Sequence, residues 1–342
     1  MRPAEPLSRL RNLGFQEVTA PGLTFEQVRV DRDALEVVGT RPALGTLVSV
    51  TAISSSSAHG EVAIAAAFAE LDRLVEIFSR HEPDSALSTL NDAGHLTGPP
   101  PELVRVLERS RYFHALSQGA FDVTVKPVLD LLGLRFPATA PTAGELRDVA
   151  ALVGAEHLTV KRRRIRFARG GMGVTLDGIA KGYIVDRMAD VLGRHEIRRF
   201  LINAGGDIRA RGLKESRRPW MVGVRDPSTD AVLPDVIALQ DGAVATSGSY
   251  ERFFDPAHRF HHIIDPASGQ SPSVAWSVSV TAPTALAADA LATTVFVLGP
   301  EAGMRLLEAL PECAGFILTE GGVQRRSSRW PGLTIGQKES IV

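Results

Sequence analysis

Asp289 and Thr293 are the two residues whose types and spacing first suggest chemistry. They stand four residues apart in an alanine- and leucine-rich run that predicts a helix, so their side chains share one helical face. A carboxylate and a hydroxyl are hard oxygen ligands of the kind that Mg²⁺ takes. An acidic residue near a helix start, stabilised by backbone N–H groups, explains the pattern without a metal. On spacing alone, this second interpretation is favoured.

The segment from Thr175 to Tyr183 has the pattern of a strand, a glycine turn and a helix. Gly178 would let a ligand or a metal approach the backbone. Lys181 adds a positive charge to the first turn of a helix, whose N-terminus attracts phosphate. An ordinary capped helix with an exposed lysine fits the segment equally well. The Walker phosphate-binding motif does not occur in it.

Three loop segments carry further candidate groups. Paired glycines in 203–207 would allow a ligand to come close, although a plain turn explains them as well. The hydroxyl-rich start of 245–252 could hydrogen-bond a phosphate or a flavin. One of the adjacent His261 and His262 could act as a general base toward an incoming hydroxyl, whereas a lone histidine is more often structural. The pair is a poor zinc signal because it has no partners at zinc-site spacing.

A fourth segment, 119–125, places Phe121 among small residues after a predicted helix. Its phenyl ring could flank a planar ring of a ligand. A turn that sends Phe121 into the core is the favoured interpretation of this segment taken alone.

The elements that must position these residues are a mixture of helices and strands. Periodic apolar residues predict helices over 61–78, 101–118, 143–152, 179–192, 285–296 and 301–310. Alternating or short apolar runs predict strands over 46–51, 158–160, 165–167, 200–202, 220–224, 236–239, 243–247, 278–281 and 315–318. Asp241-Gly242 is a hairpin signal between two of these strands. The order predicts an α+β fold with mixed, largely antiparallel sheets and flanking helices.

Composition excludes several classes of protein. The chain has 342 residues, with 38 basic and 39 acidic side chains, so no face need be strongly basic and nucleic acid is a poor partner. The basic run 161–164 is best explained as a solvated hairpin turn. Cys313 is the single cysteine, which rules out an intrachain disulfide. No run of 18 apolar residues occurs, so no membrane insertion is expected.

The N-terminal 35 residues are polar and mixed, and are expected to form a loose extension or a peripheral arm. They lack an apolar signal segment. We therefore expect a cytoplasmic protein if the chain is complete, and a periplasmic one if a signal segment has been removed.

Taken together and in order, these segments resemble the FAD:protein FMN transferase family, the ApbE-like flavin transferases. The resemblance covers about three quarters of the chain and implies a two-lobed single-chain fold over 36–342. Eight segments in the family's order argue against a chance match. They are 43–46, 78–91, 117–124, 178–186, 203–207, 245–248, 262–269 and 288–293.

The resemblance implies a reaction and a site. Such enzymes use Mg²⁺ on the pyrophosphate of FAD and transfer FMN through a phosphoester to a Thr or Ser of a target flavoprotein, releasing AMP. By resemblance, Asp289, Thr293 and the Gly178 carbonyl would ligate Mg²⁺, and His262 would activate the acceptor hydroxyl. FAD would be held by Leu44, His81, Ala120, Phe121, Asp122, Thr175, Asp177, Lys181, Ala245, Thr246 and Ser247. The expected partner is an acceptor flavoprotein, and the expected assembly is a monomer or a homodimer.

The chain departs from the family pattern at three places. Leu44 stands where the family often has Met, and His81 stands where it often has Tyr. Where the family usually has Asp-Leu-Gly-Gly, this chain has Thr175-Leu176-Asp177-Gly178, so the acid has moved by two residues. If the segment is a strand, a shift of two keeps the acid on the same face, and Asp177 could partly substitute.

Two other functions remain open on the sequence. A Mg²⁺-dependent FAD pyrophosphatase would use the same site with water as the acceptor, giving FMN and AMP. A non-catalytic FAD-binding carrier or assembly factor would need no metal pair, and Asp289 with Thr293 argues against it.

Overall fold

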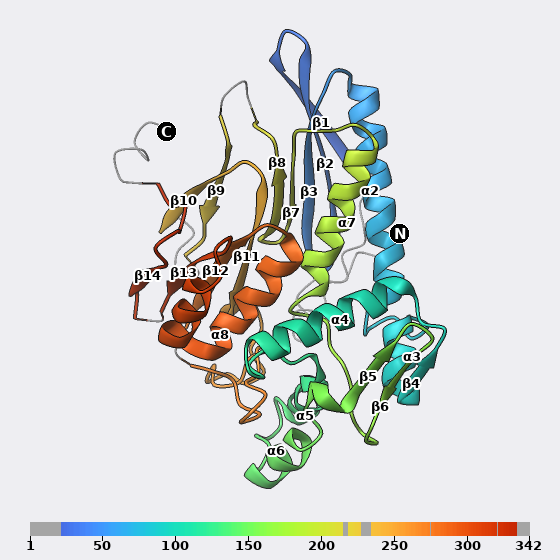
Figure 1. Cartoon of the computed structure of the whole chain (residues 1–342), viewed down its shortest axis with the longest axis vertical. Coiled ribbons are helices and arrows are strands. Elements are labelled where there is room, and N and C mark those ends of the chain that lie inside the picture. Colours follow the sequence, from blue (N-terminus) through green and yellow to red (C-terminus); the bar gives the residue numbers. More distant parts are fainter. Residues whose placement is uncertain (1–21, 215–217, 227–233, 274, 320, 334–342) are drawn as a thin grey trace, which may run out of the picture.

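An antiparallel nine-stranded sheet forms the centre of the computed structural model, which describes residues 22–214, 218–226, 234–273, 275–319 and 321–333 (Figure 1). Every neighbouring pair in it is antiparallel. The predicted α+β fold is therefore confirmed. In spatial order the strands are β1 (Thr24–Asp31), β2 (Ala34–Ala43), β3 (Thr46–Ser54), β7 (Phe200–Ala204), β8 (Asp207–Arg211), β11 (Gly242–Gly248), β12 (Ser277–Ala282), β13 (Ala314–Leu318) and β14 (Gln324–Arg326).

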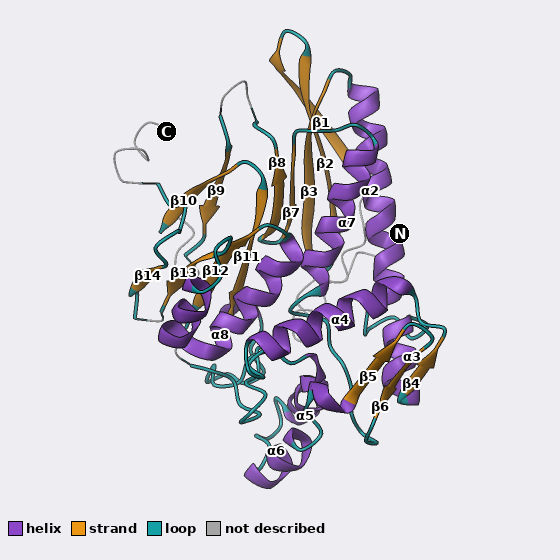
Figure 2. Ribbon diagram, in the orientation of Figure 1, coloured by secondary structure: helices purple, strands orange, loops and turns teal. Residues whose placement is uncertain are grey.

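Three long helices cover one face of this sheet (Figure 2). They are α2 (Ser57–Phe78), α7 (Ala180–Arg194) and α8 (Ala285–Glu308). α7 packs against both of the others, and α8 packs on β11 and β12. Five apolar positions at helical spacing predict this helix, and four of them, Ala67, Leu71, Leu74 and Phe78, are buried in the core between helices and sheet. The fifth, Ile77, is partly buried against the same core.

α8 joins two segments that the sequence divides into separate helices. Gly299 has a left-handed backbone, with φ of 75°, and Pro300 follows it, so the helix is kinked there. By length and mean hydropathy α8 is also apolar enough to cross a membrane. More than half of its apolar window (56 %) is buried inside the fold, as expected of a core helix.

A two-stranded sheet, β9 (Trp220–Val224) with β10 (Asp235–Leu239), packs on the opposite face of the main sheet. The predicted hairpin at Asp241-Gly242 is wrong, because β10 pairs with β9 whereas β11 pairs with β8 and β12. The physical reason is that both edges of β11 are occupied by β8 and β12, whereas β10 lies in the small sheet on the other face, so tertiary pairing overrides the local turn signal. Asp241 Oδ1 accepts a hydrogen bond from Gly212 N at 3.0 Å where the chain passes between the two sheets.

The second lobe contains α4 and short elements below the main sheet (Figure 1). β5 and β6 form a hairpin around the basic run 161–164, as predicted, and β4 joins them in a three-stranded sheet. Two short helices follow the segment that lines the candidate site. The elements are α3 (Ala86–Ala93), β4 (His95–Thr97), α4 (Pro101–Leu116), α5 (Lys126–Arg135), α6 (Ala143–Ala150), β5 (Leu158–Lys161) and β6 (Arg164–Phe167), with 3₁₀ turns η1 (Val123–Val125), η2 (Ala155–His157) and η3 (Ser249–Glu251).

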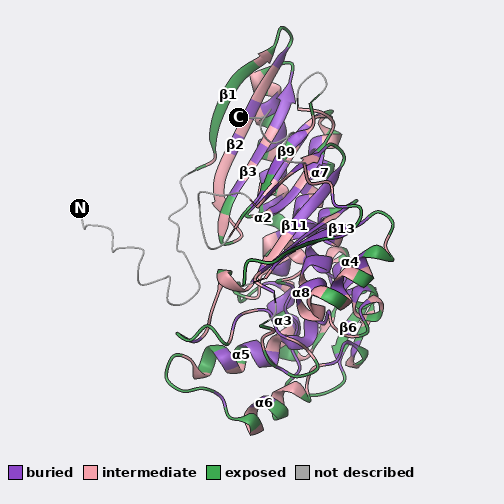
Figure 3. Cartoon of the chain, turned by 90° about the vertical axis from the view of Figure 1, so that its left-hand side faces the viewer, coloured by how far each residue is buried: buried purple, intermediate pink, exposed green. Residues whose placement is uncertain are grey.

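The main sheet begins earlier in the chain than the sequence indicates. β1 pairs with β2, and β2 already starts at Ala34, so residues 24–35 are not a loose extension. β1 is nonetheless exposed along almost its whole length, at the edge of the sheet (Figure 3). The division into an extension of 1–35 and a domain of 36–342 stays a prediction, and residues 1–21 lie outside the described part.

Candidate active site

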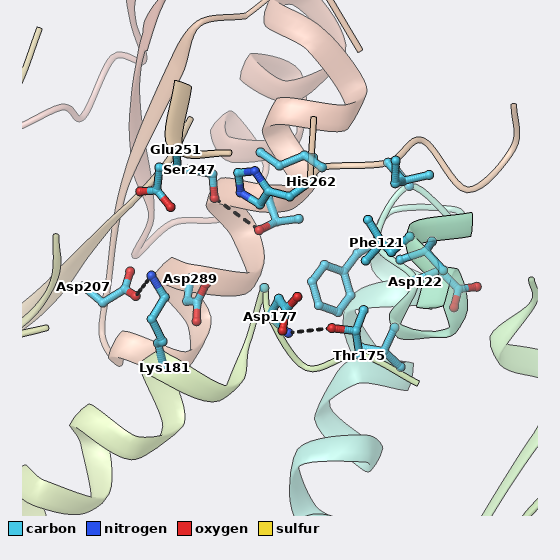
Figure 4. A pocket seen from close by; sticks show the side chains of 18 of the residues that line it. Phe121, Asp122, Thr175, Asp177, Lys181, Asp207, Ser247, Glu251, His262 and Asp289 are labelled. Atoms are coloured by element: carbon cyan, nitrogen blue, oxygen red, sulfur yellow. Dashed lines mark hydrogen bonds and ion pairs between the residues drawn. The ribbon is translucent and has the colours of Figure 1, made fainter. Parts of the chain in front are cut away.

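A cavity of about 710 Å³, part of it open to solvent, lies where α7, α8 and η1 meet the end of β11 (Figure 4). All but three of the residues predicted for the site line it. They are Ala120, Phe121, Asp122, Thr175, Asp177, Gly178, Lys181, Thr246, Ser247, His262, Asp289 and Thr293. Segments far apart in the chain therefore converge on one pocket.

Asp289 and Thr293 point from one face of α8 toward the turn before α7, as their spacing predicts. A Cβ added to Gly178 would lie 2.9 Å from Thr293 Oγ1, so glycine is what allows this turn to approach the helix. Asp289 Oδ2 accepts a hydrogen bond from Gly182 N at 3.0 Å. Ser247 Oγ lies 3.2 Å from Thr293 Oγ1. The Thr293 hydroxyl thus lies against Gly178, with the Ser247 hydroxyl beside it and Asp289 one helical turn away on α8.

The cavity has an acidic end around one lysine. Lys181 Nζ lies 3.2 Å from Asp207 Oδ2, and Asp289 and Glu251 also line this part. Burial and the nearby Asp207 charge raise the pKa of Asp289 well above its usual value. The Asp207 charge, followed by Glu251 and Asp289, raises the pKa of Lys181, which therefore stays protonated. Burial and crowding of the carboxyl groups around one ammonium raise the pKa values of Asp207 and Asp289, and an added cation would favour their ionised forms.

This donor set fits Mg²⁺. Mg²⁺ prefers oxygen ligands, and it commonly takes one or two carboxylates together with substrate phosphates. Asp289 would supply a carboxylate and Thr293 a hydroxyl, and the turn brings the Gly178 backbone close to Thr293. No group of three or more His, Cys, Asp or Glu side chains within the described residues is arranged to hold a metal. A metal here would therefore depend on phosphate oxygens of a ligand as well.

The segment before Gly178 is a turn and not the predicted strand. Thr175 Oγ1 accepts a hydrogen bond from Asp177 N at 3.3 Å, which stabilises the turn. Arg80 holds the Asp177 carboxylate through two contacts, Nε to Oδ1 at 3.3 Å and Nη2 to Oδ2 at 3.1 Å. Desolvation in the cavity raises the pKa of Asp177, but the charge and the hydrogen bond of Arg80 lower it further, so the pKa lies below its usual value. The displaced acid thus lines the cavity, but as half of an ion pair.

Asp122 lines the cavity without offering its carboxylate to it. Oδ1 accepts from Thr124 N and Thr124 Oγ1, at 2.7 and 2.6 Å, and Oδ2 accepts from Ala155 N at 2.9 Å. Oδ2 also lies 3.2 Å from His114 Nδ1. These bonds fix the wall of the cavity formed by 120–125. Phe121 belongs to the core as the segment alone suggests, yet it also faces the cavity.

His262 has the properties of a base. Its Nδ1 is buried and has no hydrogen-bond partner within the described residues, while its backbone N donates to Arg252 O at 3.2 Å. Burial lowers the pKa of His262 to about 4, so the imidazole is neutral at pH 7. A neutral ring with an unused nitrogen at a cavity wall can accept a proton from a bound hydroxyl.

Leu44, His81 and Ala245 are the predicted contacts that do not line the cavity. Leu44 lies at the tip of the β2–β3 hairpin, with φ of 54°. His81 is exposed beside Arg80, and Ala245 is buried in β11, whose next two residues reach the cavity. Their assignment to FAD stays a prediction.

Asp207 and Glu251 are lining residues that the sequence interpretation does not assign to the site. Both lie inside segments that attract notice for other reasons, the paired glycines of 203–207 and the hydroxyl-rich 245–252. A signal for Asp207 was present in the sequence, because an acid follows directly after two glycines that form a turn. Such a turn places the acid at the first position of the next strand, β8.

Comparison with known proteins agrees with this geometry. The ApbE family model matches residues 44–317. A Treponema pallidum protein named FAD:protein FMN transferase is 34% identical over 299 residues, covering 78% of this chain and 80% of its own. A Vibrio cholerae protein of the same name is 35% identical over 254 residues, covering 70% and 75%.

Solved structures agree as well. The ApbE protein of Thermotoga maritima superposes with a TM-score of 0.78 at 30% identity, covering 89% of this chain and 97% of its own. The flavin transferase ApbE of Vibrio cholerae gives 0.74 at 30% identity, covering 91% and 100%. This chain therefore belongs to the ApbE family.

Proposed function

We propose that this protein transfers FMN from FAD to a threonine or serine hydroxyl of an acceptor flavoprotein and releases AMP. Family membership and relatives named FAD:protein FMN transferase support the reaction. Within the molecule, the proposal rests on one observation. A neutral histidine lines the same cavity as a group of acidic and hydroxyl side chains. His262 and Asp289 both line that cavity.

The transfer needs one bond to form and one to break. The acceptor oxygen attacks the FMN phosphorus, the bond from that phosphorus to the AMP oxygen breaks, and the hydroxyl proton must leave. The neutral imidazole of His262, which lines the cavity, would accept that proton. Because burial lowers the pKa of His262 to about 4, the ring is already in its basic form at pH 7.

Asp289, Thr293 and the Gly178 carbonyl would hold Mg²⁺, which neutralises pyrophosphate charge and stabilises the departing AMP. Lys181 lies in the first turn of α7, where its ammonium and the helix N-terminus attract phosphate. Thr246 and Ser247 bring hydroxyl groups to the same cavity. Positioning and charge compensation of this kind account for most of the catalysis of phosphoryl transfer.

The amounts of AMP and free FMN formed from FAD distinguish a transferase from a pyrophosphatase and from a non-catalytic carrier. The protein is incubated with FAD and Mg²⁺, with and without a small acceptor domain, and AMP and free FMN are quantified by chromatography. Transfer gives AMP that depends on the acceptor, with little free FMN. Equal amounts of AMP and FMN without acceptor would show a pyrophosphatase instead. Bound FAD without AMP would show a carrier.

A further inference from the structure

Asp207 is a buried acid for which the reaction described above has no use. It is 2% exposed and is the first residue of β8, an interior strand of the main sheet. The preceding turn is held by Gly206 N, which donates to Asn203 Oδ1 at 3.0 Å. A Cβ on Gly205 would lie 2.6 Å from Thr46 Oγ1, so the turn also packs closely on the neighbouring hairpin. The Asp207 carboxylate is therefore fixed in place by the sheet.

Lys181 stands between this acid and a second one. In Figure 4 its nitrogen lies between Asp207 and Asp289, with the ion pair drawn to Asp207. Asp289 is 4% exposed, and its one hydrogen bond within the described residues comes from Gly182 N. Charges on both acids raise the pKa of Lys181, and the larger effect comes from Asp207. A flexible lysine thus has two buried carboxylates within its electrostatic reach.

The two possible pairings have different consequences. Paired with Asp207, the ammonium leaves Asp289 facing the cavity. Paired with Asp289, the ammonium would neutralise the carboxylate and take the place of a cation there, because a buried carboxylate strongly favours a charged partner.

We propose that Asp207 is a positioning residue that draws the Lys181 ammonium away from Asp289 and so keeps the Asp289 carboxylate available to a divalent cation. The inference rests on the proposed function, since it takes Asp289 as the metal ligand. It assigns Asp207 no contact with the metal or with FAD.

A double-mutant cycle on the full chain tests this, with Mg²⁺ affinity measured by isothermal titration calorimetry on protein saturated with FAD and without an acceptor, because FAD supplies the phosphate oxygens. Asp207→Asn should weaken Mg²⁺ binding about tenfold or more while Lys181 is present. In the Lys181→Met background the same change should alter the affinity by less than about threefold, because no ammonium remains to compete. Circular dichroism and thermal unfolding verify the fold of each variant, and Asp207→Ser repeats the cycle should Asp207→Asn fail to fold.

Two results would overturn the proposal, and they differ in what they say about the reaction. An equal loss of affinity in both backgrounds would show that Asp207 acts only through its general negative charge, and would leave the proposed function standing. A lack of Mg²⁺ binding by the FAD-saturated unmodified protein would overturn both this inference and the assignment of a metal to Asp289.

Discussion

His261 and His262 are adjacent histidines with different surroundings. His261 is 3% exposed, and both ring nitrogens are used, with Nε2 lying 2.8 Å from Pro272 O and Nδ1 accepting from Ile263 N at 3.3 Å. His262 leaves Nδ1 without a hydrogen bond within the described residues. A ring with both nitrogens engaged holds its surroundings together, whereas a ring with one unused nitrogen can take a proton.

Replacing His262 should therefore affect the chemical step more than binding. His262→Ala is expected to slow FMN transfer about 10²- to 10⁴-fold, the usual range for loss of a general base. Its dissociation constant for FAD, measured by fluorescence quenching, should change less than about threefold by the same reasoning. An equal loss in both quantities would show that His262 positions the cofactor.

Asp289 is the residue on which a metal-dependent reaction depends most. Asp289→Ala is expected to reduce Mg²⁺-dependent turnover by about 10²- to 10³-fold, since a metal contributes several kcal/mol to charge stabilisation. The rate is measured over a range of Mg²⁺ concentrations, with Asp148→Ala, an exposed acid of α6, as the control for loss of an acid outside the cavity lining. Unchanged activity in Asp289→Ala would refute the metal assignment.

At the scale of elements, the site depends on how closely the turn before α7 approaches α8. A Cβ at Gly182 would lie 2.3 Å from Ala285 O, so glycine is also required where the two helices meet. Asp186 fixes the same junction by accepting from Ala285 N and Leu286 N, both at 2.9 Å. The relative position of Lys181 and Asp289 therefore follows from packing between two helices.

Gly178→Ala tests this approach. The added Cβ would lie 2.9 Å from Thr293 Oγ1, so the turn or the hydroxyl must move. We expect Mg²⁺ affinity to fall about tenfold and stability by about 1–3 kcal/mol, as for other overpacked sites. Calorimetry and urea unfolding measure the two effects.

Gly133→Ala is the matched control, because it lies in α5 and its Cβ would have no atom within 4 Å. Alanine there should leave metal affinity unchanged and favour the helix by up to about 1 kcal/mol. Normal Mg²⁺ affinity in Gly178→Ala would contradict a metal site at this turn.

Local sequence patterns predict some features of this arrangement and do not predict others. The shared face of Asp289 and Thr293, and the place of Lys181 in the first turn of α7, follow from helical periodicity over a few residues. Arg80 pairs with Asp177 across 97 positions, which no local pattern reveals. The Asp241-Gly242 turn signal fails for the same reason, since β11 pairs with β8 and β12 and not with β10, the strand next to it in the chain.

For the whole molecule, the burial of His261 in its neutral form makes the free energy of unfolding depend on pH. Burial lowers the pKa of His261 from 6.5 to about 4. The unfolded chain therefore binds the proton first as pH falls, and stability is lost between about pH 6.5 and pH 4. The loss from this one residue amounts to at most about 3 kcal/mol.

Urea unfolding at pH 7, 5.5 and 4.5 measures this effect. His261→Gln should lose less stability than the unmodified protein over the same interval, because glutamine does not titrate. Parallel losses in the two proteins would show that other groups account for the acid sensitivity.

The fold class was accessible from the sequence because antiparallel strands and long amphipathic helices leave clear local patterns. That the site residues come together in one cavity could be predicted only from the resemblance to a family, since Asp122, Lys181 and His262 come from three distant segments. Asp207 is an example of a residue that neither the local pattern nor the family resemblance assigned to the site. Its importance comes from burial and from a lysine on another element, and neither is visible in the order of residues.

Intact mass spectrometry of a purified acceptor domain, after incubation with this protein, FAD and Mg²⁺, tests the central claim most directly. The acceptor should gain the mass of one FMN. The gain should disappear when Mg²⁺ is chelated or when the acceptor hydroxyl is removed by a threonine-to-alanine change. An acceptor of unchanged mass, beside AMP and free FMN in solution, would contradict the account.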